Sequence, residues 1–149
     1  MNPFDIKSVL LAKHAQHVVL IHFPIALFLV GVGFDLVAQW TKNRTLAAAA
    51  YYNLAGAAIA SVPVLITGLL AWQLALGGAK LKGILLMHLV LACAASLLMW
   101  TTGWLHFRAN RNPERQLPGY RVPIELLAVA LVALTAHLGG YLSGVNVPN

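Results

Sequence analysis

Four long apolar runs, separated by short polar segments, constrain the fold of this chain more than any other feature. They extend over about residues 18–40, 46–76, 84–107 and 122–142. A helix needs about 20 residues to cross roughly 30 Å of hydrocarbon, and each run is at least that long. Backbone groups in lipid must bond within the chain, so the runs predict helices. They lack the alternation of a membrane barrel strand.

The scarcity of charge leads to the same conclusion. Of the 149 residues, 60% are hydrophobic and 9% are charged, whereas about 25% are charged in an ordinary soluble domain. The net charge of +6 comes from basic residues in short segments between apolar runs, which is typical of membrane proteins and not of nucleic-acid binding. The single cysteine, Cys93, excludes an internal disulfide framework and a cysteine-based zinc site.

The chain is therefore expected to be all-α: an integral membrane four-helix bundle of one domain, with a short N-terminal helix in the membrane interface. No internal repeat is apparent. The first and third connections carry six Lys and Arg residues, against four on the other side. The positive-inside rule then places these connections in the cytoplasm of a bacterium and both termini outside its inner membrane.

Histidines are the most informative residues in so apolar a chain. His22, His88 and His137 each lie about five residues inside a different span, and the alternating direction of the spans puts them at similar depth on the outer side. His14 and His17 approach the same level from the N-terminal segment. Ionisable residues within a bilayer usually face the bundle interior, where they pair or bind a ligand. Alternatively, each imidazole bonds a neighbouring carbonyl or hydroxyl group.

The outer level lacks carboxylates, and this limits which ligands it can bind. Asp35, His106 and Glu125 fall toward the cytoplasmic end, so the outer level offers imidazoles without carboxylates. Mg²⁺ and Ca²⁺ prefer oxygen ligands and are disfavoured. Zinc and copper accept imidazole. A b-type haem needs one or two axial histidines and an apolar slot, which a helix bundle provides.

We expect haem b, one or two per chain, with zinc or copper as the alternative cofactor. His22 and His88 are the first choice of axial ligands or metal ligands, and His137 is the next. His14 or His17 is a further candidate ligand. Three glycines in the outer half suit a flat macrocycle or, equally, close helix packing: Gly68, Gly139 and Gly140.

Pro24 and three charged residues also allow structural predictions. Pro24 removes a helix hydrogen bond, which predicts a kink or a late helix start under His22, unless it simply occupies the first turn. Asp35 is expected to be structural. Arg121 and Glu125 are four residues apart on one helix and are expected to form an interfacial ion pair.

The segment from His17 to Leu27 contains the motif His-Phe-Pro-Ile-Ala-Leu, beginning at His22. It resembles the opening of a bacterial family of small four-span membrane proteins known only as a domain of unknown function. Four further features of the family are matched. Asp35 corresponds to its aspartate in span one, and residues 67–69 to its Thr-Gly-Leu in span two. His88 corresponds to the histidine that opens span three, and residues 139–142 to the terminal Gly-Gly-x-Leu. The family's usual His-Pro pair is absent, because Ala15 follows His14 and Val18 follows His17.

The resemblance implies four-span topology, and the fusion of such domains to cytochrome c modules implies a redox role. Together with the histidines, it predicts a b-type cytochrome-like electron carrier, more than a stand-alone enzyme, at the outer face. Its partners would be the lipid bilayer, a quinol and a periplasmic cytochrome or other membrane subunits, and a homo-oligomer stays open. The alternative is a non-redox subunit that binds zinc or copper, or a structural anchor of a larger complex.

Overall fold

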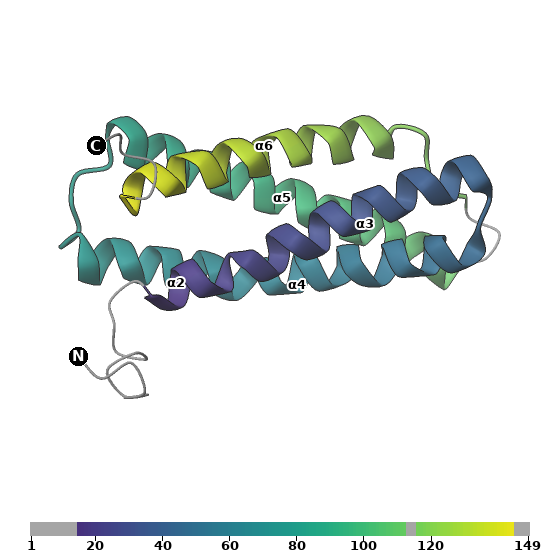
Figure 1. The fold of residues 1–149 in the computed structure, drawn as a ribbon, viewed down its shortest axis with the longest axis horizontal. Coiled ribbons are helices and arrows are strands. Elements are labelled where there is room, and N and C mark those ends of the chain that lie inside the picture. Colours follow the sequence, from purple (N-terminus) through teal and green to yellow (C-terminus); the bar gives the residue numbers. More distant parts are fainter. Residues whose placement is uncertain (1–14, 113–115, 145–149) are drawn as a thin grey trace.

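The computed structural model describes residues 15–112 and 116–144. All regular structure in these two ranges is helical (Figure 1). The elements are α2 (Ala15–Leu20), α3 (His22–Thr41), α4 (Arg44–Ala75), α5 (Gly83–Arg111) and α6 (Arg121–Leu142). Four stretches are long and apolar enough to cross a membrane, and they coincide with the four predicted spans. The predicted bundle is therefore confirmed, while most of the predicted interfacial helix lies outside the described residues.

Helix α2 is continuous with the first span instead of forming a separate element on the membrane surface. The apolar stretch runs from Gln16 to Thr41 and is interrupted only at Ile21. The Ile25 N–H reaches the Ile21 carbonyl at 3.4 Å, a long helical bond. Pro24 has no N–H for the carbonyl of Leu20, which explains a break at this point. The helix is thus interrupted near Pro24, as the kink interpretation expects, and Pro24 also lies in the first turn of α3, as the alternative expects.

The chain is arranged as two helical hairpins, α3 with α4 and α5 with α6 (Figure 1). The first hairpin turns in two residues. Lys42 takes a left-handed conformation with φ of 56° and ends α3. The Asn43 side chain accepts bonds from the N–H groups of Thr45 and Leu46 and caps α4, as Asn commonly does at a helix start. Such short turns make the paired helices antiparallel.

The tightly packed core occupies only one half of the bundle. Among the described residues, those that are buried lie within residues 24–38, 50–61, 95–106 and 121–132. The far ends of the helices, residues 62–75, 83–94 and 133–142, contain none. The two hairpins lie together near the α3–α4 turn and separate toward the other end (Figure 1). Packing therefore holds the bundle at one end and leaves the other loosely filled.

The two hairpins repeat one another in the positions that they bury, with an offset of 71 residues. All four buried positions of α4 recur in α6, and five of the six in α3 recur in α5. The α3 and α5 pairs are Pro24 and Ala95, Phe28 and Met99, Gly31 and Thr102, Val32 and Gly103, and Asp35 and His106. The α4 and α6 pairs are Ala50 and Arg121, Leu54 and Glu125, Ala57 and Ala128, and Ser61 and Val132. Of these nine buried pairs, only Ala57 and Ala128 are the same residue type, so the sequence did not reveal the repeat.

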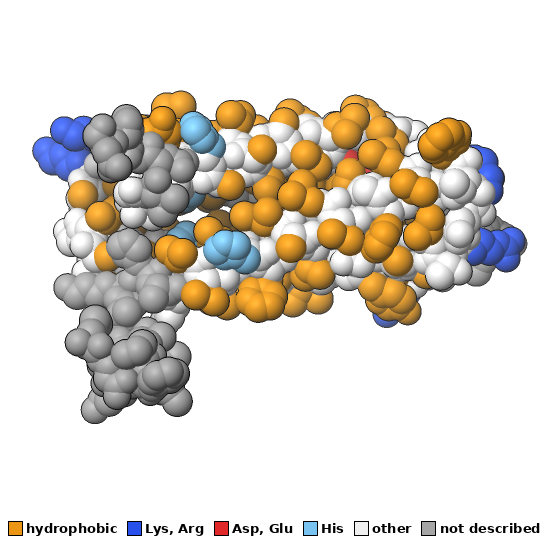
Figure 2. Space-filling view, in the orientation of Figure 1, with side chains coloured by type: hydrophobic (Ala, Val, Ile, Leu, Met, Phe, Trp, Pro, Cys, Tyr) orange, Lys and Arg blue, Asp and Glu red, His pale blue; other side chains and the backbone are white. Residues whose placement is uncertain are grey.

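The outer surface of the bundle is largely hydrophobic. Figure 2 shows hydrophobic side chains over the length of the visible face, with Lys and Arg gathered at its two extremities. Histidine side chains appear in the half that holds the start of α3 and the end of α6. This distribution fits helices surrounded by lipid.

Candidate functional site

Two sets of polar side chains lie at opposite ends of the bundle. The histidine end carries His17, His22, His88 and His137, next to the loosely filled half. The ion-pair end carries Asp35, His106, Arg121 and Glu125, next to the packed core. The sequence predicted this separation of imidazoles from carboxylates.

At the histidine end, His88 of α5 is oriented by α6. Its Nδ1 lies 3.0 Å from the carbonyl oxygen of Thr135. A carbonyl oxygen only accepts, so Nδ1 carries the proton and donates. In the neutral ring, Nε2 is then the unprotonated nitrogen, which is the form that ligates a metal.

His17 is oriented in the same way by α4. Its Nδ1 lies 3.3 Å from the Thr67 hydroxyl oxygen. That hydroxyl donates its proton to a backbone carbonyl of its own helix, 2.8 Å from the Pro63 oxygen and 3.1 Å from the Val64 oxygen. The Thr67 oxygen is therefore the acceptor for His17, and Nε2 of the neutral His17 ring is again the unprotonated nitrogen.

Both rings lie against a glycine of the partner helix. A Cβ at Gly68 would lie 3.0 Å from Cε1 of His17, and one at Gly139 would lie 3.2 Å from Cε1 of His88. The sequence left open whether these glycines make room for a macrocycle or for close packing, and in the structure an imidazole ring packs against each of them. His17 and His88 differ by 71 residues, as do Gly68 and Gly139. The two hairpins thus carry equivalent histidine sites.

The other predicted ligands are placed differently. His22 is exposed, with Nδ1 3.4 Å from the Val19 carbonyl of its own turn. His137 is exposed on α6, and its ring meets the ring of Tyr141 edge-on at 5.1 Å between centroids. Gly140 is half-buried and its carbonyl accepts from Ser143. His14 lies outside the described residues. The structure therefore does not gather His22, His88 and His137 into one cluster.

At the ion-pair end, four charged or titratable side chains from three helices meet in the interior. Arg121 Nε donates to Asp35 Oδ2 at 2.9 Å, and Arg121 also donates to the Gln39 side-chain oxygen at 3.1 Å. His106 Nε2 lies 3.0 Å from Glu125 Oε1 and 3.9 Å from Asp35 Oδ1. Glu125 is fully buried, and Asp35 is 2% exposed.

The expected ion pair between Arg121 and Glu125 is wrong. Both side chains point into the bundle, where Arg121 meets Asp35 of α3 and Glu125 meets His106 of α5. These contacts with other helices replace the expected pair within α6, because a charge buried in the interior needs a partner at the place where it lies. Asp35, His106 and Glu125 also form the one group of three potential metal ligands found in the described residues, with ligand atoms within 4.8 Å of one another. This group was not predictable from spacing along the chain, because its three residues lie on different helices.

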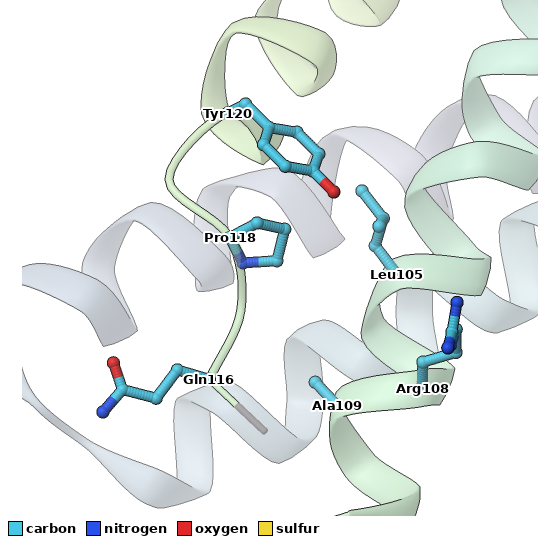
Figure 3. A pocket seen from close by; sticks show the side chains of 6 residues that line it. All are labelled: Leu105, Arg108, Ala109, Gln116, Pro118 and Tyr120. Carbon is cyan, nitrogen blue, oxygen red and sulfur yellow. The ribbon is translucent and has the colours of Figure 1, made fainter. Parts of the chain in front are cut away.

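A surface cavity of 170 Å³ lies beside the ion-pair end (Figure 3). Figure 3 shows its wall between the end of α5 and the segment that leads into α6. None of the four buried charged residues lines it. Its lining residues are Leu105, Arg108, Ala109, Gln116, Pro118 and Tyr120.

Comparison with protein families assigns the chain. A family model described as "Predicted membrane protein (DUF2231)" matches residues 13–146. The chain belongs to this family. No curated protein and no solved structure matches it. The DUF2231 description agrees with the four apolar helices and a location in the lipid bilayer, and it names no activity.

Proposed function

We propose that this DUF2231 protein is a b-type cytochrome-like electron carrier that holds haem at its histidine end. The matched pair of His17 and His88 is the observation that carries the proposal. Each ring is held through Nδ1 by the partner helix of its hairpin. This arrangement fixes the tautomer and ring orientation that metal-ligating histidines usually have.

The surroundings of the pair fit a haem. The half of the bundle that contains His17 and His88 lies outside the packed core. Residues 62–75 of α4, 83–94 of α5 and 133–142 of α6 include no buried residue. Its helices are apolar, with mean hydropathy of 1.9 to 2.1 in the four spans. An apolar slot with imidazole donors suits a b-type haem. The interior of the other half, in contrast, is occupied by the buried core side chains.

The ligand choice that this geometry favours differs in part from that of the sequence. His88 remains the first axial ligand. His17 is preferred to His22 as the second, because it occupies the equivalent position in the other hairpin and is half-buried, whereas His22 is exposed. His137 is the least favoured of the four, since it lies on the exposed face of α6.

Bound haem would supply one-electron chemistry, and the protein would supply ligands, apolar burial and orientation. The excess of Lys and Arg in the first and third connections supports an orientation with the ion-pair end in the cytoplasm. The histidine end would then face the periplasm at a bacterial inner membrane. A quinol or another membrane subunit could donate electrons there, and a periplasmic cytochrome could accept them.

A visible spectrum of the detergent-solubilised protein, produced with ample haem, tests the proposal. We expect a Soret band with sharp reduced α and β bands. His88→Ala and His17→Ala should each abolish or change these bands, whereas His137→Ala should leave them unchanged. For a His88→Gly variant, added imidazole should restore the bands.

A colourless wild-type preparation would overturn the haem proposal. Stoichiometric zinc or copper in such a preparation would favour a non-redox metal-binding subunit, and the absence of both would favour a structural anchor. Retention of the unchanged spectrum by both His88→Ala and His17→Ala would refute the ligand choice alone.

A further inference from the structure

The ion-pair end has the composition and geometry of a second site, independent of haem. Asp35 of α3, His106 of α5 and Glu125 of α6 each offer one ligand atom, and these atoms lie within 4.8 Å of one another. All three side chains are at most 3% exposed. We propose that Asp35, His106 and Glu125 bind one divalent transition-metal ion between the helices.

Two buried atoms without partners support a missing ligand at this place. Glu125 Oε2 and Thr102 Oγ1 are fully enclosed and have no hydrogen-bond partner. Thr102 lies one helical turn before His106 on α5. Such atoms are rare in native proteins, and an unseen ion or water is a common reason for them. A metal ion can satisfy Glu125 Oε2 directly, and a water bound to the ion can satisfy Thr102.

The contacts of Asp35 leave one of its oxygens for the ion. Arg121 holds Oδ2 at 2.9 Å, and Oδ1 lies on the side of His106, 3.9 Å from Nε2. Arg121 is itself fixed by Gln39. Partners of this kind orient a ligating carboxylate in metal sites.

The charges at this end also favour a cation. Two carboxylates and one guanidinium leave an excess of one negative charge when His106 is neutral. An uncompensated charge is costly in the interior of a membrane protein. A proton on His106 would also compensate this negative charge. The alternative that the experiment must exclude is therefore a protonated cluster without metal.

The donor set indicates the class of metal. Two carboxylates and one imidazole suit Zn²⁺, Mn²⁺ or Fe²⁺, with solvent completing the coordination. Ca²⁺ requires six or more oxygen ligands and Mg²⁺ keeps several waters in near-octahedral geometry. Among the three, Mn²⁺ is the sharpest probe, because carboxylates suit it and sites made only of imidazole do not.

The test uses the full chain in detergent after treatment with a chelator. We expect one Mn²⁺ per chain by equilibrium binding and EPR spectroscopy, displaced by Zn²⁺. Pulsed EPR should detect coupling of Mn²⁺ to an imidazole nitrogen. Glu125→Gln, which keeps the side-chain shape, should weaken binding by at least about tenfold, and the matched surface change His137→Gln should leave the affinity unchanged.

Failure of the wild-type protein to bind Mn²⁺ or Zn²⁺ stoichiometrically would overturn the proposal in favour of the protonated cluster. Equal affinity in Glu125→Gln would do the same. If Glu125→Gln does not fold by circular dichroism, the wild-type pulsed EPR spectrum decides, because missing nitrogen coupling excludes His106. The Soret band reports on the histidine end separately, so haem and metal can fail independently.

Discussion

At both ends of the bundle the two hairpins contribute equivalent positions, yet the two ends differ in chemistry. At the histidine end, the 71-residue repeat is kept, because each hairpin places a histidine against a glycine. At the ion-pair end the repeat is broken by residue type. Arg121 and Glu125 of α6 stand where α4 has Ala50 and Leu54.

This difference explains which end contributes more to the stability of the fold. The buried charges of the ion-pair end lie beside the hydrophobic core, where tight packing and mutual compensation hold four side chains in fixed places. The histidine end has oriented rings but no buried core around them. We therefore expect substitutions at the ion-pair end to lower the stability of the bundle as well as metal binding, and those at the histidine end to act mainly on haem binding.

The largest expected effect comes from removing the buried cation. Arg121→Met leaves the buried Asp35 carboxylate without its guanidinium partner. The free energy of unfolding should fall by about 3–5 kcal/mol, as is usual when one member of a buried ion pair is lost. Unfolding in mixed SDS micelles, followed by circular dichroism, measures the change.

Arg108→Met is the matched control for this loss. Arg108 is exposed and lies 5.9 Å from the centroid of the Trp104 ring. Its removal should cost at most about 1 kcal/mol. Similar losses in the two variants would show that the ion-pair end does not carry the stability of the bundle.

The next effect tests the close packing of the core half. A Cβ at Gly31 would lie 2.8 Å from Leu54 Cγ, whereas one at Gly33 would meet nothing within 4 Å. Gly31→Val should therefore destabilise the protein by about 1–3 kcal/mol more than Gly33→Val. Both variants change helix propensity equally, so the difference in unfolding free energy isolates the steric clash. No difference between them would contradict the observed packing of α3 against α4.

The spans were predictable because their length and apolar composition follow directly from the thickness of a bilayer. The break near Pro24 was predictable from the missing N–H of proline. The partners of polar residues were not, because they depend on how four helices are rotated about their axes. Thus Arg121 was assigned to Glu125 on its own helix, although it bonds Asp35. The contacts of His17 with Thr67 and Gly68 of α4 were not predictable for the same reason.

At the histidine end, we expect a substitution to change stability less than the variants above and to change haem binding more. Thr67→Val removes the oxygen that accepts from His17 Nδ1. The unfolding free energy should fall by about 0.5–1.5 kcal/mol. Haem affinity should fall about 10–100-fold, because the ligand loses the group that orients it. Haem titration followed at the Soret band measures the second quantity.

Thr101→Val controls for the loss of a threonine hydroxyl within a span. The Thr101 hydroxyl donates to the Leu97 carbonyl of its own helix, so its removal should leave haem affinity unchanged. Equal haem affinity in Thr67→Val and wild type would show that Thr67 does not orient a ligand.

The smallest effect on stability is expected for substitution of His22. The same variant distinguishes His17 from His22 as the second axial ligand beside His88. His22 is exposed and bonds only within its own turn, to the Val19 carbonyl. His22→Gln should change the unfolding free energy by no more than about 0.5 kcal/mol. If His17 is the second axial ligand, the Soret, α and β bands of this variant should match those of the wild type. A lost or shifted band would instead make His22 the ligand, and the first span would then have to rotate near Ile21 to bring that ring inward.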